Sequence, residues 1–265
     1  MFSYDVIGNL TQVTLPSGTV VDYNSDGLDR RAVKKVTGSV QWRYIYEDQY
    51  RVAAQLASGG SVQKEFVYAT RVNVPDYMLN SSGTKFRIIT DHLGSPRLVV
   101  KASDGTVSQR MDYTTLGEVV ADTSAGFQPF GFAGGIYDGS TQLVRFGARD
   151  YDPRSGGRWT TKDPIRFEGQ DTNLYGYVLN DPVNLIDPSG KLFEGWVGGF
   201  LSPCQQSALG AGMMAVSAAM LRAGVFSLNG GLVAGGALLG LEGGAQLKHA
   251  GKECMKQCTE GLGGF

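Results

Sequence analysis

The sequence predicts a mainly β protein of stacked hairpins, and two observations support this fold class. Short apolar runs containing tyrosine alternate with Asx and Gly turn residues at a spacing of roughly twenty residues. Glycine accounts for 38 of the 265 residues, about twice its usual share, without the Gly-X-Y period of collagen. A repeated unit of this kind buries its apolar face against its neighbours. We therefore expect stacked hairpins rather than a disordered chain.

The N-terminal segment sets the pattern of these hairpins. Turn residues occur, in order, at Tyr4-Asp5, Gly8-Asn9, Ser17-Gly18 and Asp26-Gly27. Apolar residues between them indicate strands over residues 10–15 and 20–23. The theme recurs in degraded form at residues 44–48, 66–68, 91–97 and 112–117. The first half of the chain is thus predicted to be a succession of hairpins.

Charge and cysteine content exclude several classes of function. The formal net charge of −1 gives no basic footprint, so we expect no binding to nucleic acid. The three cysteines lie in the last quarter, at Cys204, Cys254 and Cys258, so the β region depends on no disulfide. We interpret Cys254 and Cys258 as ordinary thiols rather than zinc ligands. His92 lies in a turn-forming stretch and is predicted to form a structural hydrogen bond. No metal or cofactor is expected.

Residues 1–191 carry a resemblance to the RHS/YD-repeat family. Residues 4–10 and 23–30 look like its tyrosine/aspartate repeat, and residues 91–97, DHLGSPR, are similar to its RHS block. Six further stretches resemble the RHS repeat-associated core of that family: residues 145–153, 157–159, 162–165, 173–177, 180–184 and 187–190. In that family the hairpins wind into a hollow shell that the core closes, and a variable toxin follows. The resemblance implies YD repeats over residues 1–120, a core over residues 121–191 and a variable tail over residues 192–265.

Three Asp-rich elements of the core invite a chemical interpretation. One follows a strand predicted over residues 143–148, the second is Asp163-Pro164, and the third is residues 187–190. Two carboxylates brought close together share one proton, which is the requirement of aspartic-protease chemistry. Alternatively, Asp-Pro is simply good turn chemistry, as we expect for Asp152-Pro153 and Asp181-Pro182. The residues alone leave both interpretations open.

The resemblance implies self-cleavage just past a D-P-x-G-L signature. Carried over by position, the signature falls on Asp187, Pro188 and Gly190, and the catalytic residues fall on Arg149, Asp150 and Asp163. Cleavage is then expected between Lys191 and Leu192. Lys191 occupies the leucine position, and residues 155–157 carry one extra glycine, so we expect cleavage that is slow or absent.

The tail, residues 192–265, has a different composition. Two apolar, glycine-rich stretches, residues 207–229 and 230–248, are separated by an Asn-Gly-Gly turn, which predicts a small helical hairpin. It either enters a membrane through residues 207–247 or forms a small helical domain. The catalytic constellation of a nuclease, deaminase or peptidase is not recognisable in this tail.

The resemblance therefore implies the C-terminal part of an RHS-family polymorphic toxin. Its core would present, and release by autoproteolysis, a short tail used against other bacteria or a host. The N-terminus lacks the basic and apolar regions of a signal peptide, so we expect either a specialised secretion route or the end of a longer chain. The expected partners are an upstream RHS shell and an immunity protein. The alternatives are a carbohydrate- or partner-binding surface module and a non-functional displaced cassette.

Overall fold

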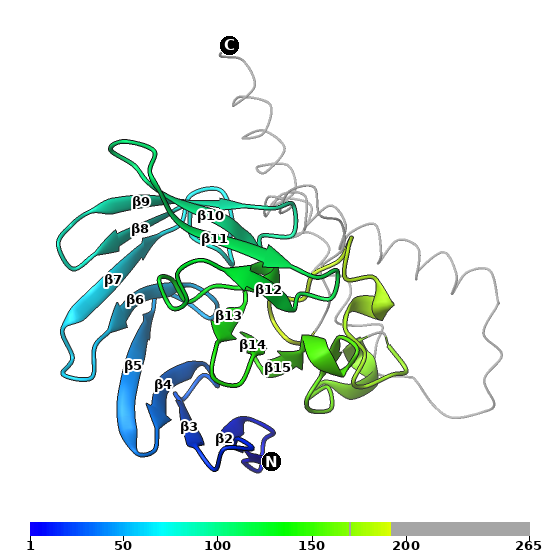
Figure 1. Cartoon of the computed structure of the whole chain (residues 1–265). Coiled ribbons are helices and arrows are strands. Elements are labelled where there is room, and N and C mark those ends of the chain that lie inside the picture. The colour runs from blue at the N-terminus through cyan, green and yellow to red at the C-terminus, as the bar shows by residue number, and fades with distance from the viewer. Residues whose placement is uncertain (170, 192–265) are drawn as a thin grey trace, which may run out of the picture. The chain divides into compact units, whose positions relative to one another are not determined.

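The computed structural model describes residues 1–169 and 171–191, and they form two antiparallel sheets (Figure 1). The first sheet contains β1 (Phe2–Tyr4), β2 (Leu10–Thr14), β3 (Val20–Ser25), β4 (Arg31–Val36), β5 (Ser39–Tyr46), β6 (Val52–Leu56), β7 (Val62–Val67), β8 (Tyr77–Asn80), β9 (Lys85–Thr90), β10 (Pro96–Lys101), β11 (Val107–Tyr113) and β12 (Val119–Asp122). The second contains β13 (Ile136–Asp138), β14 (Leu143–Phe146), β15 (Arg149–Asp152) and β16 (Arg158–Trp159). Four short 3-10 turns complete the described elements: η1 (Phe132–Gly134), η2 (Pro153–Ser155), η3 (Arg166–Gly169) and η4 (Val178–Asn180).

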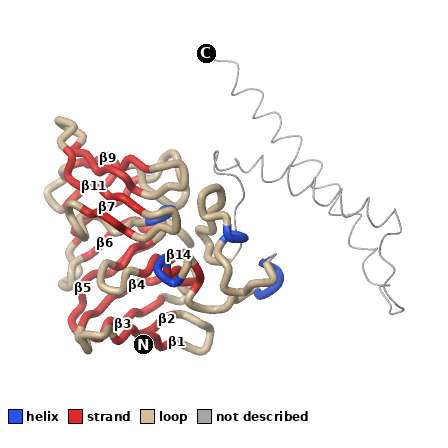
Figure 2. Tube along the Cα trace, turned by 45° about the vertical axis from the view of Figure 1, so that its right-hand side comes forward, coloured by secondary structure: helices blue, strands red, loops and turns tan. Residues whose placement is uncertain are grey.

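The twelve-stranded sheet follows sequence order, so each strand pairs with the next along the chain (Figure 2). The predicted mainly β fold of successive hairpins is therefore confirmed. The predicted helical hairpin lies in residues 192–265, outside the described residues. Within residues 1–169 and 171–191, no helix combines the length and apolarity needed to cross a membrane.

An aspartate closes each of several hairpin turns with its own carboxylate. Asp26 Oδ1 accepts hydrogen bonds from the backbone N–H groups of Leu28 (2.9 Å) and Arg30 (3.1 Å). The Arg30 Nε donates to Asp26 Oδ2 at 2.8 Å, and the same guanidinium lies 4.8 Å from the Tyr46 ring centroid. Tyr46 in turn donates its hydroxyl proton to the carbonyl of Arg31 at 2.9 Å. The tyrosine and the aspartate of the repeat thus join one hairpin to the next.

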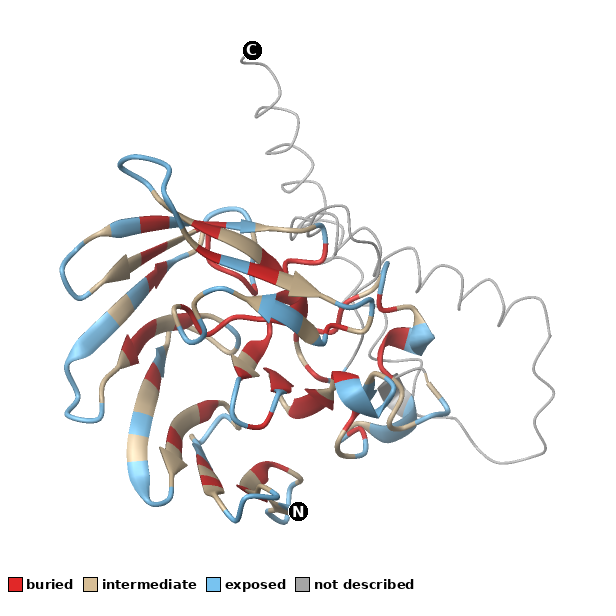
Figure 3. Cartoon of the chain, viewed as in Figure 1, coloured by how far each residue is buried: buried red, intermediate tan, exposed pale blue. Residues whose placement is uncertain are grey.

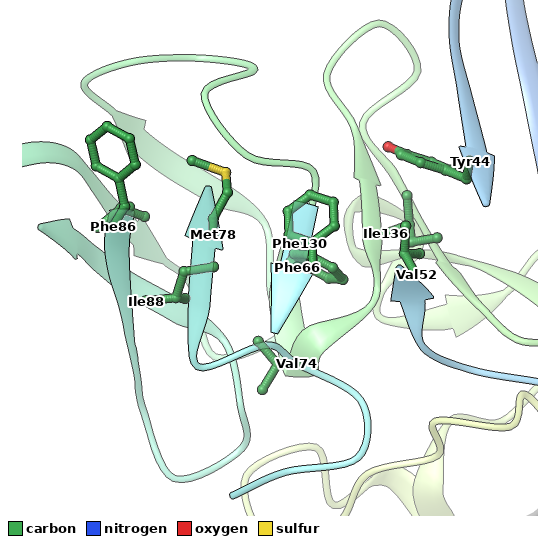
Figure 4. Close-up of a cluster of buried hydrophobic side chains, with 10 residues drawn as sticks. Tyr44, Val52, Phe66, Val74, Met78, Phe86, Ile88, Phe130 and Ile136 are labelled. Carbon is green, nitrogen blue, oxygen red and sulfur yellow. The ribbon is translucent and has the colours of Figure 1, made fainter. Parts of the chain in front are cut away.

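Side chains alternate between the two faces of the sheet, as the pleat of a strand requires. In β9, Phe86 and Ile88 are buried, whereas Lys85, Arg87 and Ile89 are exposed (Figure 3). Buried residues of β5 to β10 form one cluster (Figure 4). Phe130, from the segment before β13, and Ile136, the first residue of β13, belong to the same cluster. The segment that leads into the second sheet therefore contributes to the core of the first.

The strand predicted over residues 143–148 is shorter than expected. It ends at Phe146, and residues 149–152 form the next strand, β15. Gly147, with φ of +38°, makes the turn between them. A Cβ at Gly147 would overlap the carbonyl oxygen of Ser189, so the turn requires glycine.

A buried ion pair joins the two sheets. Lys34 Nζ of β4 lies 2.6 Å from Asp138 Oδ1 of β13, and the Tyr23 hydroxyl donates to Asp138 Oδ2 at 2.6 Å. Burial alone would raise the pKa of Asp138, but Lys34 and the Tyr23 hydroxyl outweigh it and hold that pKa below its usual range. The pair therefore stabilises the folded state when Asp138 is ionised.

We predict that Lys34→Met lowers the free energy of unfolding by ~3–5 kcal/mol, because it leaves the Asp138 carboxylate buried without its cation. Lys35→Met, on the same strand but only partly buried, should change it by less than ~0.5 kcal/mol. Urea denaturation of both variants measures the difference. The loss at Lys34 should shrink as the pH falls, because without Lys34 the pKa of Asp138 is no longer held down and its protonation removes the unpaired charge. Equal losses in the two variants would contradict this role for the pair.

Candidate functional site

Arg149 is the centre of the candidate site. Its Nη2 lies 2.8 Å from Asp163 Oδ2 and 3.2 Å from Asp187 Oδ2, and its Nε donates to the carbonyl oxygen of Gly190 at 2.5 Å. The Trp159 ring stacks beneath the guanidinium, with its centroid 4.1 Å from Cζ. One buried cation therefore holds two carboxylates and a backbone carbonyl in a single cluster.

Local turn chemistry fixes both carboxylates. Asp163 Oδ1 accepts the Ile165 N–H at 2.9 Å. Asp187 Oδ1 accepts the Ser189 hydroxyl at 2.7 Å and the Lys191 N–H at 3.2 Å. Each Asp-Pro therefore serves both as a turn and as a member of the cluster, so the two interpretations drawn from the sequence are compatible.

Close packing of the backbone explains why the signature carries glycine at position 190. Gly190 has a φ of +64°, and a Cβ there would overlap the carbonyl oxygen of Phe146. Only glycine lets the signature loop pass this close to β14 and present its carbonyl to Arg149. The residue type at this position is thus set by the backbone approach that builds the cluster.

Burial shifts the pKa values of this cluster. Burial raises the pKa of Asp163, and the neighbouring charge of Arg149 offsets only part of that rise. Burial also lowers the pKa of Arg149, against the opposing influence of Asp163 and Asp187. The desolvation of both groups therefore outweighs their mutual attraction.

The structure does not bring Asp150, predicted to be catalytic together with Arg149 and Asp163, into this cluster. Asp150 is next to Arg149 on β15, and neighbouring residues of a strand point to opposite faces. Its carboxylate is instead held by Arg31 of β4 and Arg145 of β14, each at 2.9 Å. The carboxylate that meets Asp163 at Arg149 is Asp187, which the sequence assigned to the signature alone.

Five aromatic rings form a platform behind the cluster. They belong to Phe132, Phe146, Tyr151, Trp159 and Tyr177, and all five are buried. The Tyr151 and Tyr177 centroids lie 4.5 Å apart, and the Trp159 and Tyr177 centroids lie 5.2 Å apart. This rigid packing explains why Trp159 can hold Arg149 in one orientation.

A small cavity of about 20 Å³ lies against the cluster, lined by Arg149, Asp163, Asp187, Lys191 and others. That volume admits one water molecule. Lys191 is the last residue before the undescribed part of the chain, and Leu192, the other half of the predicted cleavage site, lies outside the described residues. The signature loop therefore brings Lys191 to the cavity beside the two carboxylates.

Known proteins share this architecture. A family model described as Teneurin YD-shell matches residues 1–183. The chain belongs to this family. The resemblance to RHS/YD-repeat proteins predicted from the sequence motifs is therefore confirmed.

Relatives and solved structures agree with the assignment. Mouse Teneurin-3 is 35% identical over 201 residues, which cover 70% of this chain and 7% of that protein. Salivary gland surface protein 1 of Aedes aegypti is 33% identical over 110 residues, covering 40% of this chain and 3% of that protein. The crystal structure of TcdB2-TccC3 without its hypervariable C-terminal region has a TM-score of 0.54 at 22% identity, covering 71% of this chain and 10% of that one. The chain thus spans about a tenth or less of the proteins it matches.

A strained turn borders the cavity of this YD-shell protein. Val178, Leu179 and Asn180 of η4 all have positive φ, of 43°, 55° and 62°. The left-handed region costs roughly 1–2 kcal/mol for each L-residue other than glycine. Val178 and Leu179 also line the cavity beside Asp163. Strain of this kind persists only where the surrounding packing imposes it, and it concentrates at functional sites.

The sequence missed the roles of Asp187 and Trp159. Strand alternation could have excluded Asp150 beside Arg149, and Asp187 was then the remaining buried Asp-Pro aspartate. Nothing in the sequence placed Trp159 under the guanidinium. The structural hydrogen bond predicted for His92 is confirmed, since its Nε2 lies 2.9 Å from the Val183 carbonyl. Among residues 1–169 and 171–191, no group of His, Cys, Asp and Glu side chains is arranged to hold a metal ion.

We predict that Leu179→Gly raises the free energy of unfolding by up to ~1 kcal/mol, because glycine removes the strain of the left-handed backbone. Val183→Gly is the matched control, with a side chain 43% exposed against 47% for Leu179 and without a positive φ. Val183→Gly should lower the free energy of unfolding by ~0.5–1 kcal/mol, because glycine makes the unfolded chain more flexible. Thermal and chemical denaturation compare the two. A similar loss in both variants would show that η4 is unstrained.

Proposed function

We propose that this chain is the C-terminal part of a YD-shell scaffold whose core cleaves its own backbone after Lys191. In this proposal residues 1–120 are the repeat region, residues 121–191 are the core and residues 192–265 are the released tail. The observation that supports it is the Arg149 cluster, in which two carboxylates and the Gly190 carbonyl converge on one guanidinium. The catalytic residues are then Arg149, Asp163 and Asp187.

The two aspartates take different roles. Asp163, whose pKa is raised by burial, is the protonated member and donates to the scissile carbonyl. Asp187 accepts hydrogen bonds from Ser189, Lys191 and Arg149 and is the member that takes a proton from water. Water oxygen bonds to the carbonyl carbon of Lys191, the C–N bond to Leu192 breaks, and the leaving nitrogen receives a proton. One carboxyl and one amino terminus result, so the atoms balance.

Arg149 serves as a positioning and electrostatic group in this scheme. Its hydrogen bond to the Gly190 carbonyl fixes the residue just before Lys191, and its charge keeps both carboxylates within reach. Lys191 is a partly solvated cation beside this acid pair, where the family signature carries leucine. Cleavage slower than in relatives follows from that departure.

The tail is the proposed effector. One solved neighbour is described as lacking a hypervariable C-terminal region, which supports a variable segment at the corresponding place in this chain. We propose a membrane-active toxin that acts through residues 207–247, exported by a specialised secretion system or displayed at the cell surface. The name Salivary gland surface protein 1 supports a surface location. An upstream shell and an immunity protein are the proposed partners, and the name TcdB2-TccC3 joins two components in the solved neighbour.

We predict that the purified full chain separates with time into fragments 1–191 and 192–265, followed by intact mass spectrometry. Asp163→Asn should slow this cleavage at least ~100-fold, because it removes the proton donor. Asp152→Asn is the matched control: Asp152 caps the Arg154 N–H at 3.0 Å, a role that asparagine also fills. One full-length species over days would overturn the proposal. Full cleavage by Asp163→Asn would remove Asp163 from it.

We predict that the cleavage rate falls as the pH rises, because the reaction requires the proton on Asp163. The raised pKa keeps that proton bound above the usual aspartate value of about 3.9. The folded state binds this proton more tightly than the unfolded state, so its contribution to stability is also greatest at low pH and declines as the pH rises through the raised pKa. Rates measured by mass spectrometry across pH give the profile. A rate that climbs through this range would contradict the assigned roles.

A further inference from the structure

A second cavity lies at the seam between the two sheets, away from the Arg149 cluster. Its volume is about 30 Å³. Arg31 and Tyr46 line it from the twelve-stranded sheet, and Ile136 and Arg145 line it from the four-stranded sheet. Asn73, from the segment between β7 and β8, contributes to the same wall. The cavity therefore lies where three separate parts of the chain meet.

Two buried polar atoms of this wall lack a hydrogen-bond partner within the described structure: the donor Arg145 Nε and the acceptor Asn73 Oδ1. Arg145 is 3% exposed and Asn73 is 6% exposed, so bulk water does not solvate either side chain well. An unsatisfied buried polar group costs about 1–3 kcal/mol. Two such atoms on one cavity wall point to an occupant that satisfies both.

The remaining polar atoms of both side chains are already committed, which fixes their orientation. Arg145 Nη1 lies 2.9 Å from Asp150, and Nη2 donates to Asn9 Oδ1 at 2.8 Å and to the Asp29 carbonyl at 2.9 Å. Asn73 Nδ2 donates to the Ala133 carbonyl at 2.8 Å. The amide cannot flip to offer its nitrogen to the cavity without losing that bond.

The occupant must accept a hydrogen bond from Arg145 and donate one to Asn73. A water molecule does both, and a cavity of this volume holds one or two. A small anion would accept from Arg145, but it would face the oxygen of Asn73 and have no proton to donate.

We propose that the seam cavity is a hydration site, in which one water or a chain of two bridges Arg145 Nε and Asn73 Oδ1. The bridge ties the segment between β7 and β8 to β14. It also completes the hydrogen bonding of Arg145, the residue that holds Asp150 on β15. The site is part of the seam between the two sheets, and this proposal does not depend on self-cleavage.

A crystal structure of the full chain, soaked in bromide and refined with ordered solvent, tests the proposal. We expect a water peak within about 2.7–3.2 Å of Arg145 Nε, and either this water or a second one at the same distance from Asn73 Oδ1. Anomalous bromide density at the site would overturn it in favour of an anion. A direct bond between the two side chains, or a cavity without density, would overturn it as well.

Solution measurements give an independent readout. In NMR spectra the Arg145 Nε–H should show a cross-relaxation peak to a long-lived water. Asn73→Leu should abolish that peak, because leucine is of similar size and offers no acceptor. Gln109→Leu is the matched control, since Gln109 is also buried with an unpartnered Oε1 but does not line this cavity. If Asn73→Leu does not fold, the spectrum of the wild-type protein tests the proposal by itself. Absence of the cross-relaxation peak from that spectrum would refute the proposal.

Discussion

The structure depends on one buried carboxylate, Asp150, held between two arginines. Arg31 comes from β4 and Arg145 from β14, so the ion triad joins the repeat sheet to the core sheet. Burial would lower the pKa of Arg31, yet Asp150 outweighs it and raises that pKa; the pKa of Arg145 falls because burial dominates. Such a triad contributes little net stability compared with apolar packing, but removing Asp150 would leave two buried arginines without their carboxylate. The triad thus links β4, β14 and β15 through one side chain.

Strand alternation extends that constraint to the candidate site. β15 presents Asp150 to the seam and Arg149 to the cluster on the other face, so fixing one residue fixes the other. Trp159, on the paired strand β16, then stacks under Arg149, and Gly147 lets the signature loop approach β14. The seam and the cluster are therefore two faces of the same short strand.

Local chemistry in the sequence sufficed for the hairpins. Turn aspartates such as Asp26 act on their own backbone N–H groups, so their positions are readable without tertiary contacts. The composition of the cluster was readable only in part: Arg149 and Asp163 lie together as expected, but Asp150 lies on the opposite face of β15. The partner of Asp163 is set by a long-range contact through Arg149, which residue spacing does not encode. The resemblance predicted which residue types belong to the core. The alternation of side chains along β15 determines which of them lie together.

The dimensions of the cluster bear on what it could act upon. Its cavity has room for one water molecule, and Trp159 and the strained turn at Val178 and Leu179 form part of its wall. A separate peptide would have to displace the signature loop, whose Gly190 carbonyl already occupies the hydrogen-bonding position at Arg149. The cleavage proposed above avoids this competition, because its substrate is the signature loop itself, whose Lys191 already lines the cavity.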